Sequence, residues 1–259
     1  MSKKLENRIA AEKAFHNARF SSHFSAPPAS RYYLALEYWY MDYLARINEM
    51  PAQSVLEIGS GTESLALQLV CADFEFSSID ISEEAIAFAR TKARLPQAKF
   101  SVQDAHRTNF TSESFDLIIG RGVLHHLDIE LACAEIKRVL KPGGRIVFGE
   151  PLACNVLINL YRKSTPKIRS SDEKPLSQRT LRLLQDQFGE LNINYYGFLT
   201  LLPAVFGLKS PKFLHHLDNV LLNTLGLGRF LAWACIILSS EKNDKLFWLK
   251  LNILKNSIK

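Results

Sequence analysis

The chain has 259 residues, of which 47% are hydrophobic and 22% are charged, with 12 glycines and 10 prolines. This length suffices for one α/β domain with additions, and the composition excludes collagen, disulfide scaffolds and disordered chains. The formal net charge of +6 is unevenly placed: residues 1–150 carry 17 Lys and Arg against 19 Asp and Glu, and residues 151–259 carry 15 against 7. A uniformly basic chain would have suggested nucleic acid binding. Here the excess of positive charge lies in residues 151–259, so its role is expected to be specific to that part of the chain.

The targeting signals and cysteines point to one compartment. The first twenty residues carry charges throughout, so we expect no signal peptide. The longest apolar stretches, around residues 198–208 and 230–238, are too short to span a bilayer. The four cysteines show no CxxC spacing, which argues against a zinc knuckle or redox pair. We expect a soluble, cytoplasmic protein.

Secondary structure is predicted to begin with two helices, residues 3–20 and 31–49, separated by the helix-breaking pair Pro27-Pro28. Strands and helices then alternate. Strands are predicted at residues 54–59, 74–81, 99–105, 115–124, 145–151, 192–202 and 229–240. Helices are predicted at residues 62–72, 82–94, 128–140 and 175–188. This alternation indicates βαβ units and a mostly parallel sheet with helices on both faces.

The segment between the first strand and the next helix predicts a nucleotide site. Gly59 and Gly61 follow the strand, where ligands bind in parallel sheets and glycines let the backbone approach them closely. Asp80 ends the second strand about twenty residues later, the position at which an acid binds ribose hydroxyls. Glu57 lies two residues before the first glycine, and Ser64 stands where a dinucleotide fingerprint needs glycine. An acid there disfavours a pyrophosphate and suits a cationic ligand, such as an ammonium or sulfonium.

These residues resemble the first motif of class I S-adenosylmethionine-dependent methyltransferases, in the methyltransferase type 11, small-molecule branch. The resemblance continues in register over about residues 50–150. It includes Val102-Gln103-Asp104-Ala105, the segment from Phe115 to Leu127, and Leu140-Lys141-Pro142-Gly143-Gly144 before the fifth strand. Five motifs in order are a specific signal, although Glu63 replaces a glycine often found in the first loop and Arg121 lies where relatives often have Asn or Ser.

The resemblance implies a fold, a domain organisation and a cofactor. The fold is α/β: a Rossmann-like, doubly wound, mostly parallel seven-stranded sheet with helices on both faces, an N-terminal helical lid and a C-terminal helical insertion. We expect a lid at residues 1–50, a cofactor-binding core at 51–151, and at 152–259 the last strands, an apolar substrate cover and a basic tail. The cofactor is expected to be S-adenosyl-L-methionine. Its candidate binding residues are Glu57, Gly59, Ser60, Gly61, Asp80, Ile81, Asp104, Ala105 and Arg121, with no specific role carried onto Arg121.

His126 and His125 are the candidate catalytic residues. They follow the fourth strand on the active face, and an imidazole can act as a general base near neutral pH. A packing role is the alternative for both. Metal binding is not expected, since further ligands are not evident in the sequence.

The final third is rich in apolar residues. Leu214, Leu217, Leu221 and Leu225 recur at helical spacing, which predicts one buried face in an insertion, residues 203–228, that covers the substrate. The tail, Lys245–Lys259, reads as a basic amphipathic helix that either docks on its own domain or contacts an anionic membrane.

We therefore expect an enzyme that transfers a methyl group from S-adenosylmethionine to oxygen, nitrogen or carbon of a small-molecule acceptor, apolar or anionic. No nucleic acid partner is expected, and the sequence does not define an oligomeric state. Two alternatives stay open. One is a non-catalytic module that keeps the cofactor fold but binds a partner or membrane. The other is a nicotinamide-dependent oxidoreductase, which Glu57 and Ser64 disfavour.

Overall fold

The computed structural model describes residues 3–21, 31–69, 73–165, 170 and 173–239. The tail at 245–259 therefore lies outside the described residues. Among the described helices, none has both the length and the apolar character needed to cross a membrane.

The core of the fold is one seven-stranded sheet in the order β3-β2-β1-β4-β5-β7-β6. Its strands are β1 (Ser54–Ile58), β2 (Glu75–Asp80), β3 (Lys99–Val102), β4 (Phe115–Arg121), β5 (Leu140–Pro151), β6 (Leu191–Tyr196) and β7 (Ala234–Ser239). The first five strands are parallel, whereas β7 is antiparallel to both β5 and β6. The predicted seven-stranded, mostly parallel sheet is confirmed. The strand order reverses between β1 and β4, where ligands bind in such sheets.

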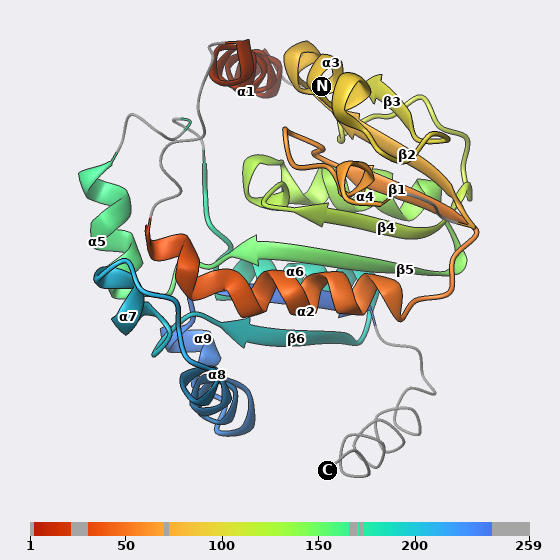
Figure 1. Ribbon diagram of the computed structural model, residues 1–259. Helices are drawn as coiled ribbons and strands as arrows, with labels where there is room; N and C mark the ends of the chain where they lie inside the picture. Colours follow the sequence, from red (N-terminus) through yellow and green to blue (C-terminus); the bar gives the residue numbers. More distant parts are fainter. Residues whose placement is uncertain (1–2, 22–30, 70–72, 166–169, 171–172, 240–259) are drawn as a thin grey trace.

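Alternating side chains divide the core between the two faces of the sheet. On one face Val55, Leu117 and Val147 pack with α2 (Glu37–Asn48). On the other face Leu56 and Ile118 belong to the cluster that includes α4 (Ile129–Val139) and α6 (Gln178–Phe188). Figure 1 shows α2 in front of the sheet, between β5 and β6, while α6 lies behind the sheet. Because successive side chains in a strand point to opposite faces, strands apolar at every position are buried on both sides.

The remaining elements flank this sheet. The N-terminal helix α1 (Lys3–Ser21) packs beside α3 (Glu83–Lys92), at the top in Figure 1. The 3-10 turns are η1 (Arg31–Leu36), η2 (Leu65–Leu67) and η3 (Leu124–His126). The C-terminal part adds α5 (Val156–Ser164), α7 (Leu201–Val205), α8 (Lys212–Asn219), the π-helical turn η5 (Val220–Thr224) and α9 (Gly228–Leu231). The expected helical N-terminus and C-terminal helices are present.

Three predictions of secondary structure are wrong in part. The helix expected at 62–72 is only η2 in its described portion, because the Ala66 carbonyl accepts N–H bonds from Arg94 and Leu95 in the chain after α3. The strand expected to run to residue 202 ends at Tyr196 and is followed by α7. The strand expected at 229–240 is preceded by α9 and begins only at Ala234.

The prediction of one buried face along the insertion is also wrong. Leu217 and Leu225 are 44% and 61% exposed. The buried side chains of residues 203–228 are instead those of Ala204, Ser210, Asp218 and Leu222.

Candidate active site

A cavity of about 2130 Å³ lies at the carboxyl ends of the central strands. Its walls come from α1, α2, the loop after β1, the ends of β2 and β4, and α5. This volume exceeds that of an ordinary small-molecule pocket and gives room for a cofactor together with an acceptor. Every candidate cofactor-binding residue predicted from the sequence lines it, and so do His125 and His126.

The loop after β1 is shaped by its two glycines. Gly59 and Gly61 have φ angles of +76° and +47°, which other residues adopt only with strain. A Cβ at Gly59 would lie 2.7 Å from Cγ2 of Val123, so the loop passes directly against the segment after β4. The backbone N–H groups of Gly59 and Ser60 donate to the carbonyl of Ile79, at 2.8 and 3.1 Å, which ties the loop to β2. The loop is thereby fixed in a backbone conformation open to the cavity.

Glu57 holds this loop from beneath. It is 7% exposed, and its carboxylate accepts hydrogen bonds from Ser64 Oγ, from Ser78 Oγ (2.6 Å) and from the backbone N–H of Leu65 (2.8 Å). Burial raises the pKa of the Glu57 carboxyl, and these three hydrogen bonds oppose that shift. Ser64, the residue that breaks the dinucleotide fingerprint, is therefore a partner of the acid that precedes it.

Asp80 joins the loop to the end of β2. Its Oδ2 accepts from the backbone N–H of Gly61 at 2.8 Å, and its Oδ1 accepts from the backbone N–H of Ser82 at 2.9 Å. Burial raises the pKa of the Asp80 carboxyl, while these backbone hydrogen bonds lower it. Each oxygen has further acceptor capacity, so the carboxylate can also bind hydroxyl groups of a ligand in the cavity.

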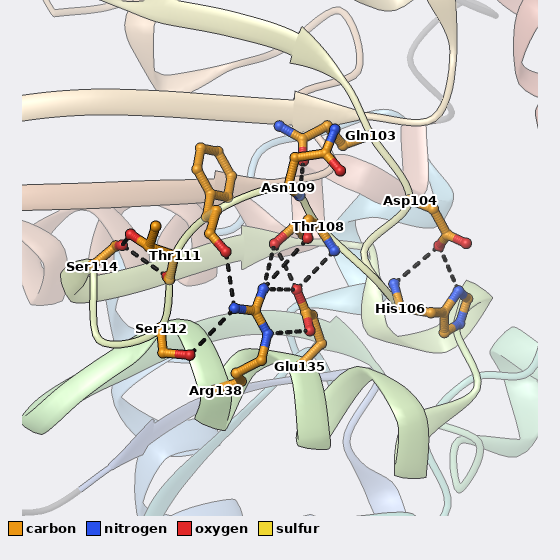
Figure 2. Close-up of polar contacts among 11 residues, drawn as sticks. Gln103, Asp104, His106, Thr108, Asn109, Thr111, Ser112, Ser114, Glu135 and Arg138 are labelled. Carbon is orange, nitrogen blue, oxygen red and sulfur yellow. Dashed lines mark hydrogen bonds and ion pairs between the residues drawn. The ribbon is translucent and has the colours of Figure 1, made fainter.

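Asp104 is held by its neighbour His106, as Figure 2 shows. Oδ1 of Asp104 lies 2.6 Å from Nδ1 of His106 and accepts from the His106 backbone N–H at 2.9 Å. Although burial alone would raise it, the pKa of Asp104 is lowered by these hydrogen bonds. Because His106 Nε2 accepts from the backbone N–H of Asp128, at 2.9 Å, the proton of the neutral ring is placed on Nδ1. These hydrogen bonds through His106 thus link Asp104 to the start of α4.

The loop that follows Asp104 is fastened to α4 by a second network in Figure 2. Glu135 accepts from the backbone N–H and the hydroxyl of Thr108, at 2.7 and 2.6 Å. Arg138 donates to both oxygens of Glu135, at 2.9 and 2.6 Å, and to the carbonyl of Phe110 at 2.8 Å. Bidentate pairs of this kind fix geometry as well as adding stability. They hold the cavity wall that carries Asp104 and Ala105.

Arg121 connects the glycine loop with α2. Its guanidinium forms an ion pair with Glu63 and lies 4.6 Å from the centroid of the Tyr40 ring. A guanidinium over an aromatic face is favourable, more so where water is partly excluded. Arg121 therefore closes one side of the cavity, and its departure from the family pattern has a structural partner in Glu63.

His125 is anchored to a buried carboxylate that the sequence did not reveal. Glu150, at 0% exposure, accepts from the backbone N–H groups of Val123 and Leu124, at 2.9 and 2.8 Å. Its other oxygen lies 2.8 Å from Nδ1 of His125, whose side chain is 8% exposed. This cluster fixes the turn that presents His126. The sequence feature that could have indicated Glu150 is an acidic residue near the end of an otherwise apolar strand.

We predict that Glu150→Ala lowers the free energy of unfolding by about 3 kcal/mol, because two buried N–H groups and a buried imidazole lose their acceptor. Glu150→Gln keeps one carbonyl oxygen and should cost about half as much. Denaturant titration of the two variants and the parent measures both values. A loss below about 1 kcal/mol for the alanine variant would contradict this role for Glu150.

His126 contacts the N-terminal helix, which covers the cavity. Its Nδ1 lies 3.2 Å from Oε2 of Glu12, and Nε2 of His16 lies 3.5 Å from the same oxygen. The other oxygen of Glu12 accepts from Ser170 Oγ at 2.6 Å. Burial alone would raise the pKa of Glu12, but the bonds to His126, His16 and Ser170 hold it well below its usual value of 4.5. Glu12 is therefore a carboxylate throughout the physiological range.

Other bonds fix α1 in this position. Arg8 donates to the carbonyl of His126 at 2.9 Å, and Asn17 donates to Glu83 and accepts from Ser82 at the start of α3. Lys13 forms an ion pair with Glu83. The helix is thus attached at both ends of the cavity, to the histidine turn and to the segment after Asp80.

We predict that Glu12→Gln loosens α1 and lowers the free energy of unfolding by about 2 kcal/mol near neutral pH. Because the pKa of Glu12 is depressed in the folded state, its contribution is complete above about pH 4.5 and declines as the pH falls below that value. The difference between variant and parent should therefore narrow in acid. Hydrogen exchange of α1 amides between neutral pH and acid measures it; a pH-independent difference would argue against the ion pair.

Two groups bring three metal-ligating side chains together. The ligand atoms of Glu12, His16 and His126 lie within 4.8 Å of one another, as do those of His125, His126 and Glu173. The carboxylate contacts of Glu12 and Glu150 account for the three imidazoles. We therefore describe the groups as clusters of imidazoles and carboxylates.

The residues at the site also fit the adenosyl cofactor that the sequence suggested. Ser60 Oγ is buried without a hydrogen-bond partner in the described part of the chain. Gly59 and Gly61 leave the loop without side chains beside it, and Asp80 adds a carboxylate at the cavity wall. A ligand with hydroxyl and amino groups matches these donors and acceptors.

Comparison with known proteins identifies the central segment. The family model described as "Methyltransferase domain" matches residues 56–148. Residues 56–148 therefore form a methyltransferase domain, as the motifs of the sequence predicted.

The similar proteins extend over different lengths of the chain. A demethylmenaquinone methyltransferase of Streptomyces griseus is 33% identical over 113 residues, which is 43% of this chain and 48% of that protein. The chain thus spans about half the length of this curated relative. A SAM-dependent methyltransferase of Thermotoga maritima superimposes with a TM-score of 0.61 at 20% identity, covering 91% of this chain and all of the other. Magnesium protoporphyrin IX methyltransferase of Synechocystis with bound SAH gives 0.55 at 16% identity, covering 89% and 98%. The likeness at these identities establishes the fold of the methyltransferase domain together with its flanking parts.

Proposed function

We propose that this protein transfers the sulfonium methyl group of S-adenosylmethionine to an oxygen, nitrogen or carbon atom of a small molecule. The observation that carries the proposal is the single cavity that joins the glycine loop and Asp80 to the His126 turn and α5. A cofactor bound at the glycine loop and Asp80 would meet an acceptor bound at the His126 turn and α5 within this cavity. The chain lines both parts with polar groups.

The roles of the site residues follow from their positions. We assign Gly59, Ser60 and Gly61 to the amino acid part of the cofactor, with Glu57 fixing the loop. We assign Asp80 and Ile81 to the ribose hydroxyls. We assign Asp104 and Ala105 to the adenine, and Arg121 to closing the wall over the glycine loop. When bound, S-adenosylmethionine supplies a methyl group already activated by its sulfonium centre, so the protein chiefly has to align the acceptor and exclude water.

His126 is the proposed general base for an acceptor whose nucleophile carries a proton. With the Glu12 carboxylate 3.2 Å from Nδ1, we assign the proton of the neutral imidazole to Nδ1, so that Nε2 is the nitrogen able to take a proton. His125 is assigned to positioning, because Glu150 fixes it within the turn.

The acceptor end of the cavity is proposed to lie along α5. Tyr161, Arg162 and Thr165 of this segment line the cavity, together with Glu173. Residues 203–228, expected to cover the substrate, contribute none of the lining side chains. Cationic Arg162 beside apolar Ile158 favours an acceptor with both an apolar body and an anionic group.

Calorimetric titration of the purified protein with S-adenosylmethionine, and with NAD in parallel, tests the proposal. We expect micromolar binding of S-adenosylmethionine and none of NAD. An acceptor screen with a labelled methyl group then identifies the product. Binding of NAD in preference would revive the oxidoreductase, and a folded protein that binds neither would support a non-catalytic module.

We retain the division into a lid at 1–50, a core at 51–151 and a C-terminal part at 152–259 as a proposal. Location in the cytoplasm, with membrane contact through the tail, is likewise proposed.

A further inference from the structure

The short helices of the C-terminal part are apolar on the side that faces away from the core. In α7, Leu201 and Ala204 are buried, whereas Leu202 and Val205 are 56% and 43% exposed. Phe206, directly after this helix, is 77% exposed. Residues 202, 205 and 206 are spaced by three and four positions and share one helical face. This face has no partner within the described residues.

The same arrangement occurs in α5 and α8. In α5 Ile158 is buried, while the outward residues Val156, Leu157 and Leu160 are 57–69% exposed. In α8 Asp218 is buried, and Phe213 and Leu217, four positions apart, are exposed on another face. Each helix therefore uses one apolar or hydrogen-bonded side to attach to the protein and leaves a second apolar side in solvent.

Hydrogen bonds join these helices into one surface. Asn155, the N-cap of α5, donates to the carbonyl of Leu231 at the end of α9 at 2.6 Å. Asp218 of α8 accepts from the backbone N–H groups of Phe198, Leu199 and Thr200, just before α7. Figure 1 shows α5, α7, α9 and α8 together at one end of the molecule. We call their exposed apolar residues the C-terminal apolar face. These residues are Val156, Leu157, Leu160, Leu202, Val205, Phe206, Leu208, Phe213, Leu217, Leu225, Leu227 and Phe230.

The exposed charges within the segments that form this face are of one sign. Lys163, Lys209, Lys212 and Arg229 are exposed beside it. Neither residues 156–164 nor residues 201–231 contain an exposed acid, since Asp218, the only acid of the two segments, is 2% exposed. Within the described residues, Lys209 is the one of these cations that is paired with a carboxylate, that of Glu37 in α2, and Arg229 lies over the ring of Phe230.

We propose that the C-terminal apolar face binds the surface of a bilayer that contains anionic lipids. Exposed Phe and Leu next to Lys and Arg, without acids, are the composition by which a protein inserts apolar side chains below anionic headgroups. Twelve of the seventeen exposed large apolar residues among the described residues belong to this face, whereas apolar residues on an ordinary surface are scattered singly. A symmetric dimer through this face would place the cations of the two copies against each other, with no acid of the face to pair them.

The binding does not depend on methyl transfer, so its test requires neither cofactor nor acceptor. The full chain is sedimented with vesicles of phosphatidylcholine alone and with vesicles of equal parts phosphatidylcholine and phosphatidylglycerol. We expect binding to the anionic vesicles that weakens as salt is raised, and at least tenfold weaker binding to the neutral ones.

Two variants separate this surface from other exposed apolar residues. Phe213→Asp lies in the first turn of α8 and should weaken vesicle binding at least tenfold. Leu131→Asp, an exposed apolar residue in the first turn of α4, is the matched control and should bind as the parent does. Circular dichroism and unchanged S-adenosylmethionine affinity verify that both variants fold.

Equal binding of Phe213→Asp and the parent would overturn the proposal and direct attention to residues 240–259. No binding to either vesicle by a folded protein would also overturn it. A dimer seen in sedimentation velocity for the parent but not for Phe213→Asp, without vesicle binding, would instead assign the face to a second copy of the chain.

Discussion

Replacing His126 with Asn should lower kcat by about 10²- to 10⁴-fold for an acceptor that must lose a proton. The reason is the pairing of His126 Nδ1 with the ionised Glu12, 3.2 Å away, which leaves Nε2 as the basic nitrogen. Asparagine keeps a polar side chain of related shape but has no group that titrates near neutral pH. The affinity for S-adenosylmethionine should change little, because Asp80 and the glycine loop are untouched.

The pH dependence separates a base from a residue that only packs. In the parent, activity should fall on the acid side as the imidazole becomes protonated, and this limb should disappear in His126→Asn. His125→Asn is the comparison: its ring is held by Glu150, so we expect a loss of stability with the acid limb retained. A His126 variant with normal kcat, or with the acid limb intact, would remove the base assignment. Residual activity in the variant would reflect alignment of the acceptor alone.

The order of strands and helices could be predicted from sequence because each repeats a local pattern. Apolar strands such as 115–121 and capped helices such as the one after Ser82 contain their own signals. The helix expected at 62–72 failed because the Ala66 carbonyl bonds to Arg94 and Leu95, almost thirty residues away. No local pattern contains that contact. The prediction of a buried face for residues 203–228 failed for a different reason. The leucines do recur at helical spacing, but spacing does not show which side of a helix packs against the rest of the protein.

The part of the site that could be predicted from the sequence consists of residues located directly after the strands. Parallel strands bring their carboxyl ends to one edge, so Gly59, Asp80 and Asp104 could be placed together. The carboxylates that hold the histidines could not. Glu12 meets His126 across more than one hundred residues, and Glu150 reads in the sequence as part of a strand. Long-range pairs of this kind depend on how α1 docks, which composition and periodicity do not encode.

Replacing Asp80 with Ala should weaken S-adenosylmethionine binding at least tenfold, and toward a hundredfold if two charge-assisted hydrogen bonds to the ligand are lost. Two effects add. The hydroxyl groups of the ligand lose the Asp80 carboxylate as their partner. The backbone N–H of Gly61 loses the acceptor, 2.8 Å away, that sets the position of the loop. Asp80→Asn separates them: its single carbonyl oxygen can still accept from the Gly61 N–H, with the bond from the Ser82 N–H lost, while the negative charge is absent, so we expect an intermediate affinity.

Calorimetry on the parent and the two variants gives all three dissociation constants. Glu84→Ala is a control that removes an acid from the first turn of the neighbouring helix α3, and it should leave the affinity unchanged. Equal affinities for Asp80→Ala and the parent would mean that the cofactor does not contact the end of β2. If Asp80→Asn instead binds as weakly as Asp80→Ala, the charge of Asp80 outweighs its support of Gly61. The carboxylate would then act on the ligand directly, and the loop would depend chiefly on Glu57 for its shape.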